Sequence, residues 1–333
     1  HHAALDGYQR ISPKQLIDGP PSSNGNGHRN GNGNGNGNGK KIVYQSQEVS
    51  ALGNEDFKSA YRLDYAYVVD AMDCGIASKE LVENLAKNGM LSFLSTKGRS
   101  LHAINDDLKY LADALENVPT TYGINITYHY DDEERLNKLI ELAYLYELEV
   151  IVYTGHYQIP DKLVEYRLRE TKKGSGQLNK LFVKASSADI INRFLAPAPE
   201  AIVNSLYQKN KISKAVLSEA KHLPLANTLC IATDSGSETM HDSFSVLLPF
   251  VQQKIKTLRR EHQYREAIFV GIGGVGVPTS IASAFLLGVD FVLSHSINYC
   301  TLEAKLAPFS KSLLAEAEVS DICFAPYKDL LFG

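Results

Sequence analysis

The sequence lacks a basic excess, a long apolar run and a paired-cysteine motif. It has 34 lysine and arginine residues against 38 acidic ones, a formal net charge of −4. A nucleic-acid binder needs the opposite balance to neutralise phosphates, so this composition argues against such a function. No apolar stretch reaches the ~18 residues needed to span a bilayer, and no secretory signal is visible, which predicts a cytoplasmic protein.

The cysteines are too few and too scattered for a disulfide framework or a zinc site. The four are Cys74, Cys230, Cys300 and Cys323. None forms a CxxC pair, so we expect reduced, buried thiols. Hydrophobic residues make up 44% and charged residues 22% of the 333 residues, which is ordinary for a globular protein of one or two domains.

Residues 1–45 have little to bury. An Asn-Gly repeat over Asn24–Gly39 has a large backbone entropy to lose on folding. We expect a disordered linker, serving either as a tether between modules or as a tail, followed by one folded domain over 46–333. The abrupt end at Gly333 predicts a truncated C-terminus.

From about Tyr61 onward, short β-type runs alternate with helical patterns. The expected strands are Tyr65–Val69, Met90–Phe93, Gly123–Thr127, Glu149–Tyr153, Leu181–Lys184, Leu229–Thr233, Ala267–Gly271 and Phe291–Leu293. The expected helices between them include Ser78–Asn88, Asn105–Asn117, Glu133–Tyr146, Ser243–Glu261 and Thr279–Leu287. Ser78 and Thr279 are plausible N-caps. Eight strands with helical crossovers predict a TIM (β/α)₈ barrel.

The spacing between strands widens once, after the fifth strand. Three consecutive helical patterns fill the gap, at Asp189–Phe194, Glu200–Gln208 and Ser213–His222. We expect a helical insertion over about 186–226, placed as a lid over the barrel mouth.

A glycine-rich run, Gly271-Ile-Gly-Gly-Val-Gly276, follows the seventh strand. It matches the G-x-G-x-x-G dinucleotide fingerprint, but that motif belongs after a first strand, and Pro278 soon enters the helix. In a barrel, the loops after strands seven and eight form the usual phosphate site, and the eighth strand here ends in Ser294-His-Ser296. The pattern favours a barrel phosphate site over a Rossmann fingerprint or a merely tight turn.

Polar residues at two strands and one loop are further candidates. Lys184 ends a strand and either points toward the site or extends to solvent. Asn125 lies mid-strand, so its amide belongs to a core network or contacts a ligand. The loop Thr233–Asp242 carries Glu238 and His241, but its acidic residues fit no metal signature and no Gly-x-Ser-x-Gly elbow of a hydrolase occurs. We expect an acid or base in this loop.

Over roughly Leu52 to Gly333 the chain resembles the trans-acting enoyl reductases of polyunsaturated fatty acid and polyketide synthases. This PfaD type is a branch of the nitronate monooxygenase-like, FMN-dependent TIM barrels. The matching stretches include Val69-Asp-Ala-Met72, Gly123-Ile-Asn-Ile126, Phe182-Val-Lys-Ala185, Phe194-Leu-Ala-Pro-Ala-Pro199, Asp234-Ser-Gly236, Gly273-Gly-Val-Gly276, Ala284-Phe-Leu-Leu-Gly288 and Ser296-Ile-Asn298.

The resemblance implies FMN on the barrel mouth, reduced by NADPH, and an enoyl thioester carried on the acyl carrier protein of a synthase module. It places Ala71 and Met72 along the flavin, and Asn125 and Lys184 at its polar edge. The remaining cofactor-binding residues that it implies are Asp234, Gly236, Gly273, Gly274, Gly276, His295 and Ser296.

The chain departs from the family pattern at the chemistry. Asp70 and His295 replace glycines, Glu238 replaces a histidine and Tyr299 replaces a glutamine. Ionised Glu238 cannot donate a hydrogen bond to a thioester carbonyl, and its charge repels a developing enolate. His241, three residues on, would take the place of the histidine only if the loop bends.

Three functions are therefore open: an active enoyl reductase, which leads; a catalytically degraded paralogue acting as a carrier-protein binding or structural module; and a nitronate monooxygenase-like flavin oxidase.

Overall fold

A computed structural model describes residues 48–127, 132–154, 158–171, 177–232, 244–318 and 321. The expected linker over 1–45 lies outside these residues. Within the described ranges, no helix combines the length and the apolar character that a membrane crossing requires.

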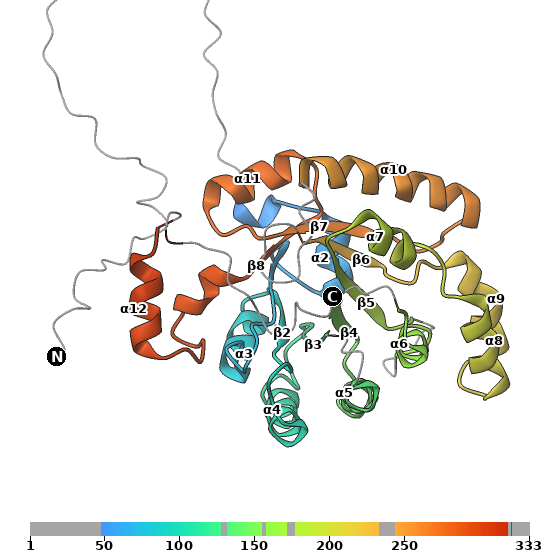
Figure 1. The fold of residues 1–333 in the computed structure, drawn as a ribbon, viewed down its shortest axis with the longest axis horizontal. Helices are drawn as coiled ribbons and strands as arrows, with labels where there is room; N and C mark the ends of the chain where they lie inside the picture. Colours follow the sequence, from blue (N-terminus) through green and yellow to red (C-terminus); the bar gives the residue numbers. More distant parts are fainter. Residues whose placement is uncertain are drawn as a thin grey trace, which may run out of the picture. The chain divides into compact units, whose positions relative to one another are not determined.

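Eight parallel strands pair in chain order and close into a barrel, with β8 beside β1 (Figure 1). They are β1 (Tyr67–Val69), β2 (Leu91–Leu94), β3 (Gly123–Thr127), β4 (Val150–Thr154), β5 (Lys180–Ala185), β6 (Thr228–Ile231), β7 (Phe269–Gly273) and β8 (Phe291–Ser294). The predicted (β/α)₈ barrel is confirmed. Each predicted strand overlaps an observed one because the buried runs of β-branched and aromatic residues mark the barrel wall.

The helices surround this barrel. They are α2 (Glu55–Tyr61), α3 (Lys79–Lys87), α4 (Leu101–Ala114), α5 (Glu133–Leu145), α6 (Asp161–Arg167), α7 (Ala188–Leu195), α8 (Glu200–Gln208), α9 (Lys214–Glu219), α10 (Phe244–His262), α11 (Pro278–Leu286) and α12 (Pro308–Glu316), with short 3₁₀ turns η1 (Val49–Ala51), η2 (Ala220–His222) and η3 (Ser296–Cys300). Ser78 caps α3 as predicted, its Oγ accepting the Leu81 N–H at 3.1 Å. Thr279 is not a cap: α11 begins at Pro278, whose fixed φ and missing N–H suit a first helical position.

Helix α2 closes the end of the barrel at which the strands begin. The Phe57 ring stacks on Phe291 at 4.6 Å between centroids and meets Phe269 edge-on at 5.4 Å. The Tyr61 hydroxyl hydrogen-bonds Thr228 Oγ1 at 2.7 Å. Because these partners stand at the starts of β6, β7 and β8, the aromatic plug leaves the opposite, carboxyl end of the strands as the place for a ligand.

The insertion after β5 exists, but it is not the expected lid. Helix α7 packs on β5 and α10. The Leu225 N–H then donates to the Ala196 carbonyl at 2.9 Å, and this hydrogen bond joins the two ends of the segment that carries α8 and α9. The Arg167 guanidinium donates to the carbonyls of Leu225 and of Asn179, the residue before β5 begins. The two joined ends therefore lie at the strand-start end. Helix α8 packs on α6, and Figure 1 shows α8 and α9 at the outer edge of the helix ring.

Candidate functional site at the barrel mouth

Nine of the expected cofactor-binding residues can be placed in the structure. Asp234, Gly236, Glu238 and His241 fall in 233–243, outside the described residues. The catalytic loop that the sequence predicts therefore stays a prediction.

An ion pair spans the mouth of the barrel. Asp70 follows β1 directly, and Lys184 is the fifth residue of β5, four strands away in a ring of eight. Lys184 Nζ nevertheless lies 2.9 Å from Asp70 Oδ2. The Asp70 side chain is 5% exposed and that of Lys184 15%. The carboxyl ends of opposite strands thus meet over the barrel centre through these two side chains.

Backbone hydrogen bonds hold Asp70 in this position. Its Oδ1 accepts the Ala71 N–H at 2.8 Å, and its own N–H donates to the Ser294 carbonyl at the end of β8 at 2.9 Å. With one oxygen and the backbone fixed, the other oxygen faces Lys184. The site is tied to both β1 and β8.

Beneath the ion pair lies a buried thiol. Cys230 is fully buried in β6, and a Cβ added to Gly273 of β7 would come within 3.4 Å of its sulfur. Burial raises the pKa of the Cys230 thiol far above its usual range; Asp70 raises it further, while Lys184 lowers it. The thiol therefore stays protonated, and it packs as a small apolar group rather than serving as a nucleophile.

The two turns predicted to hold phosphate lie side by side. Gly274 has a φ of +82°, and a Cβ on Gly276 would contact Ile297 of η3 at 3.5 Å. Helix α11 begins just after the first turn and η3 begins at Ser296 in the second. A left-handed glycine beside two helix starts is a favourable place for an anion.

The second turn is braced from within. Asn298 Nδ2 donates to Ser294 Oγ at 2.9 Å and to the His295 carbonyl at 3.1 Å. The His295 ring meets the Tyr299 ring edge-on at 5.3 Å. Burial, followed by the charge of Asp73, raises the pKa of Tyr299 to about 12, so this phenol stays protonated at neutral pH.

Two expected flavin contacts have other partners. The Met72 side chain is fully buried in a small cluster with Ala77, Leu81 and Ala304, so it meets protein on all sides. Asn125 Oδ1 accepts the Thr96 N–H at 2.7 Å. The core-network interpretation of Asn125 thus has direct support, whereas contact of either residue with a ligand stays a prediction.

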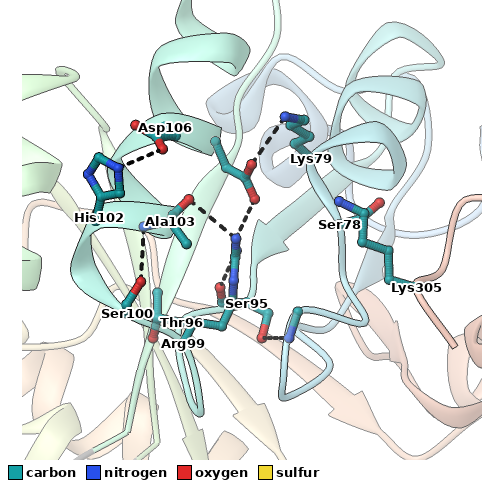
Figure 2. A network of polar contacts seen from close by, with 12 residues as sticks. Ser78, Lys79, Ser95, Thr96, Arg99, Ser100, His102, Ala103, Asp106 and Lys305 are labelled. Carbon is teal, nitrogen blue, oxygen red and sulfur yellow. Dashed lines mark hydrogen bonds and ion pairs between the residues drawn. The ribbon is translucent and has the colours of Figure 1, made fainter.

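Sequence reasoning missed the clasp that joins the loops after β1 and β2 (Figure 2). The Arg99 guanidinium donates to the Ser95 carbonyl at 3.1 Å and to Asp107 Oδ2 at 2.5 Å, and the second Asp107 oxygen lies 3.3 Å from Lys79 Nζ. Gly75, with a φ of +80°, sits against Arg99: an added Cβ would be 3.3 Å from Arg99 Cδ. In the sequence, the glycine at position 75 is the one sign that a side chain approaches the backbone this closely.

The residues present fit the phosphate end of a phosphate-bearing, redox-active ring cofactor. At the ring end, the fit depends on a lysine that already has a partner. The glycine turn and the α11 start suit the phosphate, and Lys184 lies over the barrel centre where the ring would sit, but Asp70 already pairs with Lys184. Within the described ranges no group of three His, Cys, Asp or Glu side chains is placed to hold a metal ion. Fold and site together define a TIM barrel with a left-handed glycine turn beside a helix start at its mouth.

Comparison with known proteins shows which TIM barrels this chain is similar to. No protein-family model matches the chain. It is 34% identical over 285 residues to the polyketide biosynthesis protein PksE of Bacillus subtilis, covering 84% of this chain and 37% of PksE. It is 32% identical over 288 residues to the polyketide biosynthesis protein ThaF of Burkholderia thailandensis, covering 85% and 24%. A polyunsaturated fatty acid synthase component of Thraustochytrium sp. is 25% identical over 295 residues, covering 86% and 20%. The chain thus spans little more than a third, or less, of the length of these curated relatives.

Comparison with solved structures points to the same group of proteins. The enoyl reductase domain of MlnA from the macrolactin biosynthesis cluster of Bacillus amyloliquefaciens superposes with a TM-score of 0.78 at 32% identity, covering 85% of this chain and 65% of that one. A FabK mutant from Thermotoga maritima, with a TM-score of 0.54 at 13% identity over 80% of this chain and 72% of that one, shows the fold alone. These matches confirm the resemblance to the PfaD-type enoyl reductases of polyketide and polyunsaturated fatty acid synthases.

Proposed function

We propose that the chain is an FMN-dependent enoyl reductase of a polyketide or polyunsaturated fatty acid synthase. It would reduce the α,β-double bond of an enoyl thioester carried on an acyl carrier protein, with NADPH as the electron source. The likeness to the MlnA enoyl reductase domain over 85% of the chain carries the proposal. The glycine turn beside the α11 start supports it independently.

The described residues would act as binding and orienting groups. Backbone N–H groups around Gly273, Gly274 and Gly276, with His295 and Ser296 across from them, would hold the phosphate. Lys184 would supply positive charge beneath the ring, and Ala71 would form part of its floor. When bound, the flavin supplies hydride chemistry, and a protein group must deliver a proton to the α-carbon.

The proton source is proposed in the loop after β6. Glu238 takes the place at which the family has a histidine, and His241 follows three residues later in the sequence. Protonated Glu238 would donate to the α-carbon, whereas ionised Glu238 would oppose negative charge on the thioester oxygen.

The first experiment is the visible spectrum of the purified protein before and after FMN is added, followed by anaerobic NADPH reduction and addition of a crotonyl thioester. Flavin bands near ~450 nm and reoxidation by the enoyl thioester are expected. Reoxidation by an alkyl nitronate but not by the thioester would identify the oxidase alternative. A protein that takes up no FMN would support the binding-module alternative.

Glu238 is tested separately. Loss of activity in Glu238→Gln would assign the carboxyl group a working role. If Glu238→His instead creates an activity absent from the natural chain, the natural site is a degraded one.

A further inference from the structure

We propose that Asp70 acts as an internal counter-ion that cancels the charge of Lys184 and thereby weakens the hold of the barrel mouth on a negatively charged ligand ring. This inference deepens the proposed function and rests on it for the identity of the ligand. It assigns Asp70 a tuning role that the fold does not require.

The first support is geometric. The pair joins opposite strands at 2.9 Å, and both side chains are mostly buried. Charge pairs in such surroundings are screened far less than pairs at the surface. An anion at the mouth would therefore meet a neutral pair rather than an ammonium group alone.

The second support is the neighbouring charge. Asp73, three residues beyond Asp70, pairs with Lys97 at 3.5 Å. The electrostatic surroundings of Tyr299 include both Asp73 and Asp70, so the two pairs share one region of the mouth. In each pair a carboxylate offsets the lysine charge, so the attraction of the two ammonium groups for an anionic ligand is weakened.

The third support is that Asp70 is fixed by more than Lys184. Its Oδ1 accepts the Ala71 N–H, a bond that an asparagine oxygen can also accept, and its backbone bonds Ser294. Asp70→Asn therefore removes the charge and keeps the shape. Lys184 would then lose the Asp70 carboxylate, so the surroundings of its ammonium group become more positive and an anion is bound more favourably.

The test compares the natural chain with Asp70→Asn, Lys184→Met and the control Glu149→Gln, all incubated with FMN. Glu149 is a buried acid that pairs with Arg62 at 2.9 Å and with Lys180 at 3.7 Å, next to the start of β4 at the opposite end of the barrel. Fluorescence gives the FMN dissociation constant. Sulfite titration reports charge at the ring, because sulfite donates its electron pair to form an S–N bond and leaves a negative charge on the ring.

In Asp70→Asn the sulfite dissociation constant should fall about tenfold, the size of one partly screened charge contact. It should rise in Lys184→Met and stay unchanged in Glu149→Gln. Thermal unfolding checks that each variant folds, and Asp70→Gly replaces Asp70→Asn if the latter does not.

The outcomes separate the two proposals. If the natural chain binds FMN and the Asp70 variant leaves the sulfite dissociation constant unchanged, the counter-ion role is overturned and the proposed function stands. If an Asp70 variant retains FMN and the natural chain does not, the counter-ion role is supported and the proposed function fails for the natural site. If neither the natural chain nor the Asp70 variant retains FMN, both proposals are wrong.

Discussion

Asn125 shows how a single side chain can hold a loop at the barrel mouth. It lies in β3, is 5% exposed, and supplies the acceptor for the N–H of Thr96, which is 2% exposed and follows β2. The Thr96 hydroxyl in turn donates to the Asn125 carbonyl at 2.6 Å. Two adjacent strands are thereby joined just beyond the sheet by paired polar contacts.

Asn125→Ala should lower the free energy of unfolding by about 1–3 kcal/mol, because it leaves the buried Thr96 N–H without an acceptor. Urea denaturation followed by circular dichroism measures this. The control is Asn105→Ala, which removes a partly exposed bond from Tyr146 at 2.9 Å and should cost less than about 1 kcal/mol. Equal losses in the two variants would contradict the role given to Asn125.

Cysteine reactivity should differ sharply between positions. Cys74 and Cys300 are exposed, whereas Cys230 is buried and the pKa of its thiol is raised, so little thiolate forms there. Iodoacetamide at pH 8 followed by peptide mapping should label Cys74 and Cys300 and leave Cys230 unmodified until urea is added. Labelling of native Cys230 at the rate of Cys74 would contradict the burial of Cys230 beneath the ion pair.

At the scale of elements, the loops after β1 and β2 form one unit. Gly75 and Cys74 lie on the first loop, and their N–H groups donate to Ser95 Oγ at 3.3 Å and to the Lys97 carbonyl at 3.0 Å on the second. Arg135 of α5 adds bonds to the Thr96 and Arg99 carbonyls, at 2.8 and 2.7 Å. Since Asp70 begins the first loop, this clasp positions the ion pair.

Gly75→Ala and Gly288→Ala separate backbone strain from this clasp. Both glycines have left-handed φ values, +80° and +84°, and an L-residue there costs about 1–2 kcal/mol. Only Gly75 contacts Arg99; a Cβ at Gly288 meets nothing closer than Gln252 at 3.9 Å. Both variants should unfold at lower temperature, but only Gly75→Ala should weaken FMN binding. Equal affinities would show that the clasp does not position the mouth.

At the scale of the whole molecule, stability should fall in alkali. Among the described residues, burial is the leading cause that raises the pKa of seven tyrosines: Tyr61, Tyr122, Tyr144, Tyr146, Tyr166, Tyr264 and Tyr299. The folded chain keeps them neutral, whereas the unfolded chain ionises them at about pH 10. Their contribution is complete below that pH and is lost as the pH rises above it toward the folded values.

Urea midpoints should therefore stay level from pH 8 to 9 and drop between about pH 10 and 11. Absorbance at 295 nm should show fewer titrating tyrosines in the folded protein than in urea at the same pH. A midpoint that does not change up to pH 11 would mean that these phenols ionise without unfolding.

The barrel was predictable because its strands are continuous buried apolar runs, such as Val150–Tyr153, separated by capped helices. The glycine turn was predictable because Gly274 and Gly276 directly follow the seventh strand. The pairing of Asp70 with Lys184 was not, because the residues lie 114 positions apart and charge alone does not specify a partner. The position of the insertion along the chain was predicted correctly, but its position around the barrel was not. The hydrogen bond between Ala196 and Leu225 that sets this position leaves no periodic pattern in the sequence.

The plug formed by α2 has a consequence for the order in which the chain folds. Asn54, which caps α2, hydrogen-bonds Asp290 at 2.6 Å across 236 positions, and Phe57 needs Phe269 and Phe291 as its neighbours. On a ribosome, the helix made first must wait for the strands made last. Until β8 has left the exit tunnel, Phe57 lacks its stacking partner Phe291, so the α2 end of the nascent barrel stays open and its aromatic side chains stay exposed to chaperones.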